Sequence, residues 1–187
     1  MNPVEIEFKY NAAEIALTAF TKFCQSHDPE SFILASGWDY FYENTKNPDA
    51  FCRLRVGPDS NQLTFKRKLS DKNNFVRTEH NIDLAKSVSR PQIDALVSEF
   101  GYKPNTLLFK NCFIYQYARH IFVYYVVYNA DMKELGRFIE IEMAEDAKWL
   151  SDQHALDALA ELEKLASPLG ISPQSRIKRS LWEMFKK

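Results

Sequence analysis

The stretch Val4-Glu5-Ile6-Glu7-Phe8-Lys9-Tyr10 alternates charged and apolar residues with a period of two. A β-strand sends successive side chains to opposite faces, so this stretch predicts a strand with two carboxylates and an ammonium group on one face. Near the other end of the strand-rich region, Glu140-Ile141-Glu142 repeats the arrangement. Paired carboxylates supply the oxygen ligands that divalent cations such as Mg²⁺ bind.

Basic residues occur at the same spacing between the two acidic strands, as Arg53-x-Arg55, Lys66-x-Lys68 and Arg77-x-Glu79. A single pair of this kind is typical of the solvated side of a half-buried sheet. Five such strands, with few Ser, Thr or Gln on their polar faces, instead indicate that the charged faces meet in one site. Unpaired buried charge is costly, so charges brought together there must pair with one another or bind a ligand. A polyphosphate with a divalent cation would match both signs. The alternative is an internal lattice of ion pairs without a ligand.

Composition restricts the class of protein. A chain of 187 residues that is 45% hydrophobic can form one domain with a sizeable core. Its net charge of −1 argues against a nucleic-acid-coating protein. No apolar run reaches the length of a spanning helix, so no membrane is expected. An N-terminus without an apolar signal region and three widely spaced cysteines predict a cytoplasmic, reduced protein.

Periodicity predicts strands over 4–10, 33–42, 51–56, 62–69, 75–84, 107–118, 120–129 and 137–143. One helix is predicted to start at an Asn11 cap, and a second to run from Ser89 to Gly101. Helical character returns from Ala144, with Glu161 and Glu163 on a solvated face, and a short helix is expected within 176–187. The pattern predicts an α+β fold whose antiparallel sheet is either open, with one face in water, or closed into a barrel.

Seven motifs follow one another along the chain: Glu5-x-Glu7-x-Lys9, Asp39-Tyr40-Phe41-Tyr42, Cys52-Arg53-Leu54-Arg55, Leu63-Thr64-Phe65-Lys66, Arg77-Thr78-Glu79, Leu135-Gly136-Arg137-Phe138-Ile139-Glu140-Ile141-Glu142 and Ser180-Leu181-Trp182-Glu183. In this order they resemble the motifs of the CYTH superfamily, also called triphosphate tunnel metalloenzymes. That superfamily includes class IV adenylate cyclases, thiamine triphosphatases and inorganic triphosphatases.

The resemblance implies a single domain over residues 1–187. It would be an antiparallel eight-stranded β-barrel with flanking helices, and its last helices, from about residue 144, would pack against the tunnel. A triphosphate inside the barrel would be held by Lys9, Arg53, Arg55, Lys66, Arg77 and Lys110. One or two Mg²⁺ or Mn²⁺ ions would be held by Glu5, Glu7, Glu79, Glu140, Glu142 and Asp131.

The chain departs from the superfamily pattern at three places. Asn81 stands where a second acid usually follows Arg-x-Glu, and Cys112 stands where an arginine often follows Lys110. Ala130 stands where an aspartate is usual, and Asp131 is one residue away. A one-residue slip turns a side chain to the other face, so Asp131 needs a tighter loop or a bulge to reach the tunnel. Asn129 is the other candidate.

The expected activity is that of a divalent-metal-dependent enzyme acting on a small-molecule triphosphate. Two reactions stay open, cyclisation of ATP to cyclic AMP and pyrophosphate, or hydrolysis of a nucleoside or organic triphosphate. Lys66 is the expected charge stabiliser, and Tyr42 or Tyr40 is the candidate for handling a proton. The alternative is a module that binds triphosphate or polyphosphate without turnover, and whether the protein forms a homodimer is also open.

Overall fold

The computed structural model describes residues 4–70, 73–143 and 151–186. Within these residues, strands and turns dominate up to Met143, and helices follow. The strands are β1 (Val4–Asn11), β2 (Ser31–Asn44), β3 (Ala50–Val56), β4 (Asn61–Ser70), β5 (Asn73–Leu84), β6 (Tyr102–Gln116), β7 (His120–Tyr128) and β8 (Glu134–Met143).

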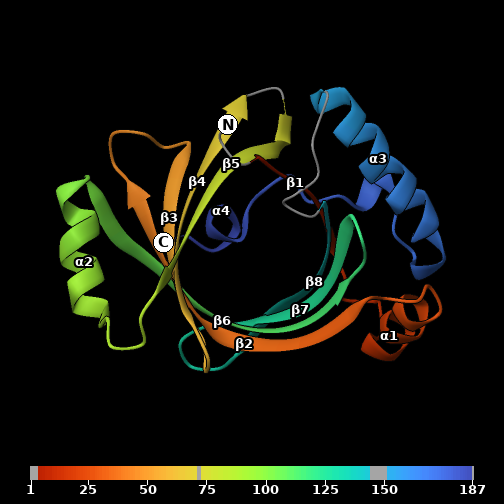
Figure 1. The fold of residues 1–187 in the computed structure, drawn as a ribbon, viewed down its shortest axis with the longest axis horizontal. Helices are drawn as coiled ribbons and strands as arrows, with labels where there is room; N and C mark the ends of the chain where they lie inside the picture. Colours follow the sequence, from red (N-terminus) through yellow and green to blue (C-terminus); the bar gives the residue numbers. More distant parts are fainter. Residues whose placement is uncertain (1–3, 71–72, 144–150, 187) are drawn as a thin grey trace.

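These strands close into an antiparallel barrel in the order β1-β5-β4-β3-β2-β6-β7-β8 (Figure 1). β1 completes the ring, because Glu5 pairs with Arg77 of β5 while Lys9 pairs with Glu140 of β8. The closed barrel, and not the open sheet, is therefore the correct alternative. The fold class predicted from the sequence, an α+β eight-stranded antiparallel barrel with flanking helices, is confirmed.

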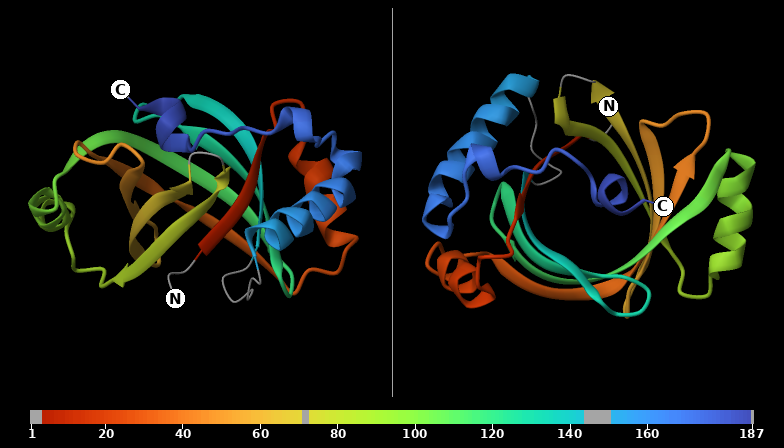
Figure 2. Two further views of the ribbon diagram at one scale, coloured as in Figure 1. Left: turned by 90° about the horizontal axis from the view of Figure 1, so that it is seen from above. Right: turned by 180° about the vertical axis from the view of Figure 1, so that it is seen from behind.

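The helices cover different parts of the barrel. Figures 1 and 2 show α2 (Arg90–Glu99) on one side, and α1 (Leu17–Gln25) and α3 (Asp152–Leu165) on the opposite side. The short α4 (Leu181–Phe185) lies across one mouth of the barrel. None of the helices in the described ranges is both long and apolar enough to span a membrane.

Most of the apolar core lies outside the barrel, between the strands and these helices. On β1, Ile6, Phe8 and Tyr10 point outward and are buried with Phe20 of α1 and Leu159 of α3. Under α2, the buried residues of a second outer cluster are Tyr42, Cys52, Leu54, Leu63, Ile93 and Val97. Because these strands bury their apolar face outward, their charged face is directed into the barrel.

A third apolar cluster closes the inside of the barrel at one end. Leu181 and Trp182 of α4 are buried, and Trp182 stacks on Phe51 of β3 with ring centroids 5.5 Å apart. Lys68 of β4 holds the same helix through Glu183, with Nζ 2.6 Å from the carboxylate oxygen. Ser180 caps α4, since its Oγ accepts from the Glu183 amide. We refer to this end, with α4 seated in it, as the plugged mouth.

The predicted helix boundaries were partly wrong. Asn11 does not cap a helix: it ends β1, its side chain accepts from the Ala13 amide, and α1 begins only at Leu17. The short helix expected within 176–187 is present, as Leu181–Phe185. Ser89 is the N-cap of α2 as predicted, and its amide donates to the Gln92 side chain at 2.8 Å. The predicted start of helical structure at 144 falls in 144–150, outside the described residues, and α3 begins at Asp152.

Candidate active site

The inner face of the barrel encloses a cavity of about 410 Å³ that is lined by most of the predicted site residues. Ser180 and Leu181 contribute to its lining from the plugged mouth. The predicted residues that line it are Glu5, Glu7, Lys9, Arg53, Arg55, Lys66, Arg77, Glu79, Lys110, Glu140 and Glu142. They come from β1, β3, β4, β5, β6 and β8, so closure of the barrel is what brings them together.

Three carboxylates form a compact group in this cavity. Glu5, Glu7 and Glu142 each offer an oxygen within 4.8 Å of the others. Burial, together with the negative charges of Glu140 and Glu7, raises the pKa of Glu142 to about 8. Burial also raises the pKa of Glu5, more than the charge of Lys66 lowers it. Such an arrangement is electrostatically unfavourable for three ionised acids and suits a bound cation.

Glu7 differs from its two neighbours. Burial alone would raise its pKa, but the charges of Lys9 and Arg77 outweigh burial and hold that pKa well below the usual range. Arg77 Nη1 lies 2.9 Å and Lys9 Nζ 3.5 Å from the Glu7 carboxylate. Lys9 also contacts Glu140, at 3.1 Å. Glu7 is therefore the member of the acidic group that is most firmly ionised.

Lys66 lies between two acids. Its Nζ is 2.6 Å from Glu5 and 2.5 Å from Glu79. Burial would lower the pKa of Lys66, but these carboxylates raise it above its ordinary value. Lys66 is therefore a permanent positive charge in the cavity.

Two basic residues have no carboxylate partner among the described residues. Arg53 donates to the Thr64 hydroxyl at 3.1 Å, and its Nε is buried without a hydrogen-bond partner. Lys110 lies over the ring of Tyr125, with Nζ 4.0 Å from the ring centroid. Both side chains line the cavity, so they are available to an anionic ligand.

Arg55 is positioned by Asp39, an acid that the sequence did not single out as a site residue. Asp39 is fully buried and accepts from Arg55 Nε and Nη2 at 2.7 and 2.8 Å. Burial would raise the pKa of Asp39, but the charges of Arg55 and Arg53 depress it. The two parallel hydrogen bonds fix the guanidinium plane of Arg55 toward the cavity.

Tyr125 is a second residue that the sequence reasoning missed. It is fully buried, its hydroxyl donates to Glu140 at 2.7 Å, and its ring contacts Lys110. The alternation of β7 carried the signal, because Val123, Tyr125 and Val127 share the inward face.

Asn81 stands where the superfamily pattern usually has a second acid. It donates to Glu79 at 2.8 Å and accepts from Thr64 at 2.7 Å, so it orients an acid in place of supplying one.

Two predicted site residues lie away from the cavity. Tyr42 is buried on the outer face beneath α2, and its hydroxyl donates to Asp94 at 2.7 Å. Asp131 is exposed in the turn between β7 and β8, where its amide donates to the Asn129 side chain at 3.0 Å. Neither Tyr42 nor Asp131 can contact a ligand in the barrel, so a proton-handling role for Tyr42 and a metal-ligand role for Asp131 are wrong. Asn129 belongs to the same turn and does not line the cavity either.

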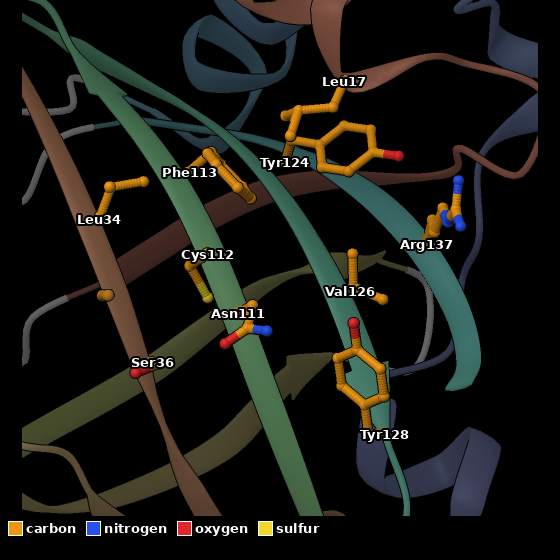
Figure 3. Close-up of a pocket in the computed structure, with 11 residues that line it drawn as sticks. Leu17, Leu34, Ser36, Asn111, Cys112, Phe113, Tyr124, Val126, Tyr128 and Arg137 are labelled. Atoms are coloured by element: carbon orange, nitrogen blue, oxygen red, sulfur yellow. The ribbon is translucent and has the colours of Figure 1, made fainter. Parts of the chain in front are cut away.

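A second cavity, of about 500 Å³, lies on the outer surface of β2, β6 and β7 (Figure 3). Its lining is mostly apolar, with Leu34, Phe113 and Tyr124 among the side chains drawn in Figure 3. It contains none of the predicted site residues. The inner cavity is therefore the candidate active site.

No family model and no curated protein matches the chain. Solved structures do match over nearly its full length. A conserved hypothetical protein of Pyrococcus furiosus is 20% identical, with 97% of this chain and 99% of that chain covered and a TM-score of 0.75. A protein of Vibrio parahaemolyticus named "putative adenylate cyclase" is 15% identical, with 98% of each chain covered and a TM-score of 0.68.

The same comparison finds a chain from the Schizosaccharomyces pombe Mediator head module, 13% identical, with 89% of this chain and 94% of that chain covered and a TM-score of 0.61. At these identities the likeness concerns the fold, and a shared fold does not establish a shared activity. The closed antiparallel barrel is the fold that the resemblance of the ordered motifs to the CYTH superfamily implied. The chain therefore has the same fold as these solved structures, a closed eight-stranded antiparallel barrel.

Proposed function

We propose that this protein is a divalent-metal-dependent enzyme that acts on a nucleoside or organic triphosphate inside the barrel. The observation that carries the proposal is the placement of both charge groups in one cavity. Glu5, Glu7 and Glu142 offer clustered oxygens, and Arg53 and Lys110 offer positive charge without a carboxylate partner among the described residues. A triphosphate with its cation is a ligand that complements both.

The donor set fits Mg²⁺ or Mn²⁺. Carboxylate oxygens are the ligands that these hard cations prefer, and the acidic group contributes no sulfur or nitrogen. Burial and the charges of Glu140 and Glu7 raise the pKa of Glu142 to about 8, and a cation bound beside it would offset this effect. When bound, the cation would neutralise phosphate charge and activate or stabilise the reacting oxygens.

The basic residues would hold the phosphate oxygens. Phosphoryl and nucleotidyl transfer depend mainly on positioning and on neutralising charge. Arg53 can donate from its unpartnered Nε, and Arg55 is held in place by Asp39. Lys66 would stabilise charge that develops on the transferred group, exchanging part of its contact with Glu5 or Glu79 for phosphate oxygen.

Two reactions are compatible with this site. In cyclisation, the 3′-hydroxyl of ATP attacks the α-phosphorus, a new P–O bond forms, and pyrophosphate leaves. In hydrolysis, water attacks the terminal phosphorus, the bond from that phosphorus to the bridging oxygen breaks, and the diphosphate leaves, so that the terminal phosphoryl group becomes orthophosphate. The name of the Vibrio parahaemolyticus protein makes cyclisation the first reaction to test.

The decisive experiment is chromatography of the products after incubation with ATP, thiamine triphosphate or tripolyphosphate, each with Mg²⁺ or Mn²⁺. Cyclic AMP with pyrophosphate identifies a cyclase, and orthophosphate with a diphosphate identifies a hydrolase. Stabilisation of the protein by ATP without any product would instead identify a binding module.

The metal assignment is tested with Glu5→Gln and Glu142→Gln. Each variant is expected to lose metal-dependent turnover by about 100-fold or more, because a ligand to the cation is removed. Glu134→Gln, the same change at an exposed position of β8, is the matched control and should retain activity. Turnover equal to wild type in both Glu5→Gln and Glu142→Gln would exclude the proposed metal site.

A further inference from the structure

The inner cavity is not charged throughout. One part of its wall consists of β-branched apolar side chains from β2, β6 and β7, namely Ile33, Ile114, Ile121 and Val123. The register places these side chains next to one another, since Ile33 pairs with Ile114 and Ile114 pairs with Val123. We call this surface the apolar wall. The three strands form one curved side of the barrel in Figure 1.

The apolar wall adjoins the acidic group directly. Ile121 pairs with Glu142, and Val123 pairs with Glu140, across the β7–β8 ladder. Side chains that pair across antiparallel strands lie about 5 Å apart at Cβ. A ligand whose phosphates contact the acidic group through a cation would therefore bring whatever is attached to those phosphates onto the apolar wall.

The side chains of the apolar wall are not fully buried. Ile33 lines the cavity and is nevertheless 41% exposed. Ile114 and Ile121 are only partly buried, although both pack against the apolar cluster at the plugged mouth. Contact with this surface does not stabilise phosphate oxygens, because apolar side chains offer no hydrogen bond and displace the water that solvates the charge. An organic group would cover it favourably.

One polar group lies at the edge of this surface. Gln116 lines the cavity and pairs with Ile121, and its Oε1 accepts from the Ser31 hydroxyl at 2.6 Å. That hydrogen bond fixes the amide so that Nε2 is the free end, and Nε2 has no partner among the described residues. The free amide can donate to an acceptor atom on a ring that covers the neighbouring isoleucines.

We propose that the apolar wall and Gln116 bind the organic group of the ligand, so that the protein selects triphosphate esters of a heteroaromatic group over inorganic tripolyphosphate. The inference rests on the proposed function, since it assigns the remaining part of the same cavity. A ring with a hydrogen-bond acceptor, as in a nucleobase, matches apolar contact from Ile33, Ile114 and Ile121 together with one donor from Gln116.

The test compares affinities for ATP and for tripolyphosphate by calorimetric titration of the full chain in the presence of Ca²⁺, which also binds oxygen ligands. Wild-type protein should bind ATP more tightly than tripolyphosphate. Ile33→Ser should weaken ATP binding by about fivefold, through lost apolar contact, and leave tripolyphosphate binding unchanged. Gln116→Met should also weaken only ATP binding, by about fivefold, through the lost donor.

Ile82→Ser is the matched control, because Ile82 is also a strand isoleucine, is 48% exposed and does not line the cavity. It should change neither affinity. Equal wild-type affinities for the two ligands, or an equal loss of both in Ile33→Ser, would overturn the inference while leaving triphosphate binding established. Binding of neither ligand by wild-type protein would overturn the proposed function, and the inference with it.

Discussion

The two faces of β1 have opposite surroundings. Inward, Glu5, Glu7 and Lys9 contact other charged side chains that line the cavity, whereas outward, Ile6, Phe8 and Tyr10 pack against apolar neighbours beneath the helices. An apolar strand face usually points into the interior of the fold, but here the strand faces on the outside of the barrel form most of the core. Neighbouring residues of β1 should therefore have separate roles: substitutions on the outer face should change stability, and substitutions on the inner face should change ligand binding.

The largest effect is expected on the outer face. Phe8 is 1% exposed and carries Arg176 over its ring at 3.7 Å. Phe8→Ala should lower the free energy of unfolding by about 3–5 kcal/mol, because the cavity it leaves cannot fill completely. Urea denaturation followed by circular dichroism measures this. An unchanged midpoint would mean that the outer cluster is not the core that holds β1.

Asp39→Asn tests whether the inner face also contributes to stability where its charges are fully paired. Removing the charge should lower the free energy of unfolding by about 2 kcal/mol at neutral pH. This is less than the usual effect for a buried ion pair, because the Arg55 side chain is 35% exposed. The folded-state pKa of Asp39 is lowered by Arg55 against the effect of burial. Its stabilising effect is therefore present above the unfolded pKa of about 4 and disappears as the pH falls below it.

The measurement for Asp39→Asn is the difference in unfolding free energy between wild type and variant across pH 2–8. That difference should be constant above about pH 5 and should shrink toward acid. A difference that stays the same down to the lowest pH would show that the pair does not act through the charge of Asp39.

Arg53→Gln should have the smallest effect on the fold and a clear effect on ligand binding. Arg53 has no carboxylate partner among the described residues, and its buried Nε lacks a hydrogen bond, so its loss should leave the unfolding midpoint within error. Triphosphate affinity should fall about 30-fold, corresponding to about 2 kcal/mol for hydrogen bonds to a charged group. Arg67→Gln, on the exposed outer face of β4, is the control. A midpoint lowered as far as that of Phe8→Ala would contradict the separation of the two faces.

The local sequence pattern was sufficient to predict the strands and to predict which face of each strand carries most of the charged side chains. Period-two alternation placed Glu5, Glu7, Glu140 and Glu142 on polar faces, and the cavity lining agrees. The same alternation, continued from Asp39, puts Tyr42 on the outer face, so this error was avoidable. Closure of the barrel is a long-range property, and it was anticipated from the ordered motifs and not from periodicity.

Other errors had causes that no local pattern reveals. Glu163 was taken as solvated, but it is 3% exposed and accepts from the Tyr10 hydroxyl at 2.7 Å and from Arg176. Its partners come from β1 and from the segment before α4, both distant in sequence. Asn11 binds the Ala13 amide in a turn, which is the usual competitor of a helix cap for this residue type.

The pairing of β1 with β8 has a consequence for how the chain reaches its folded state. Lys9 leaves the ribosome long before its strand neighbour Glu140 is made. Until then, β1 carries an unpaired edge and an apolar face without its cover. Such distant pairings make folding slow compared with that of a helical protein of equal length, so nascent β1 needs protection from association with other chains.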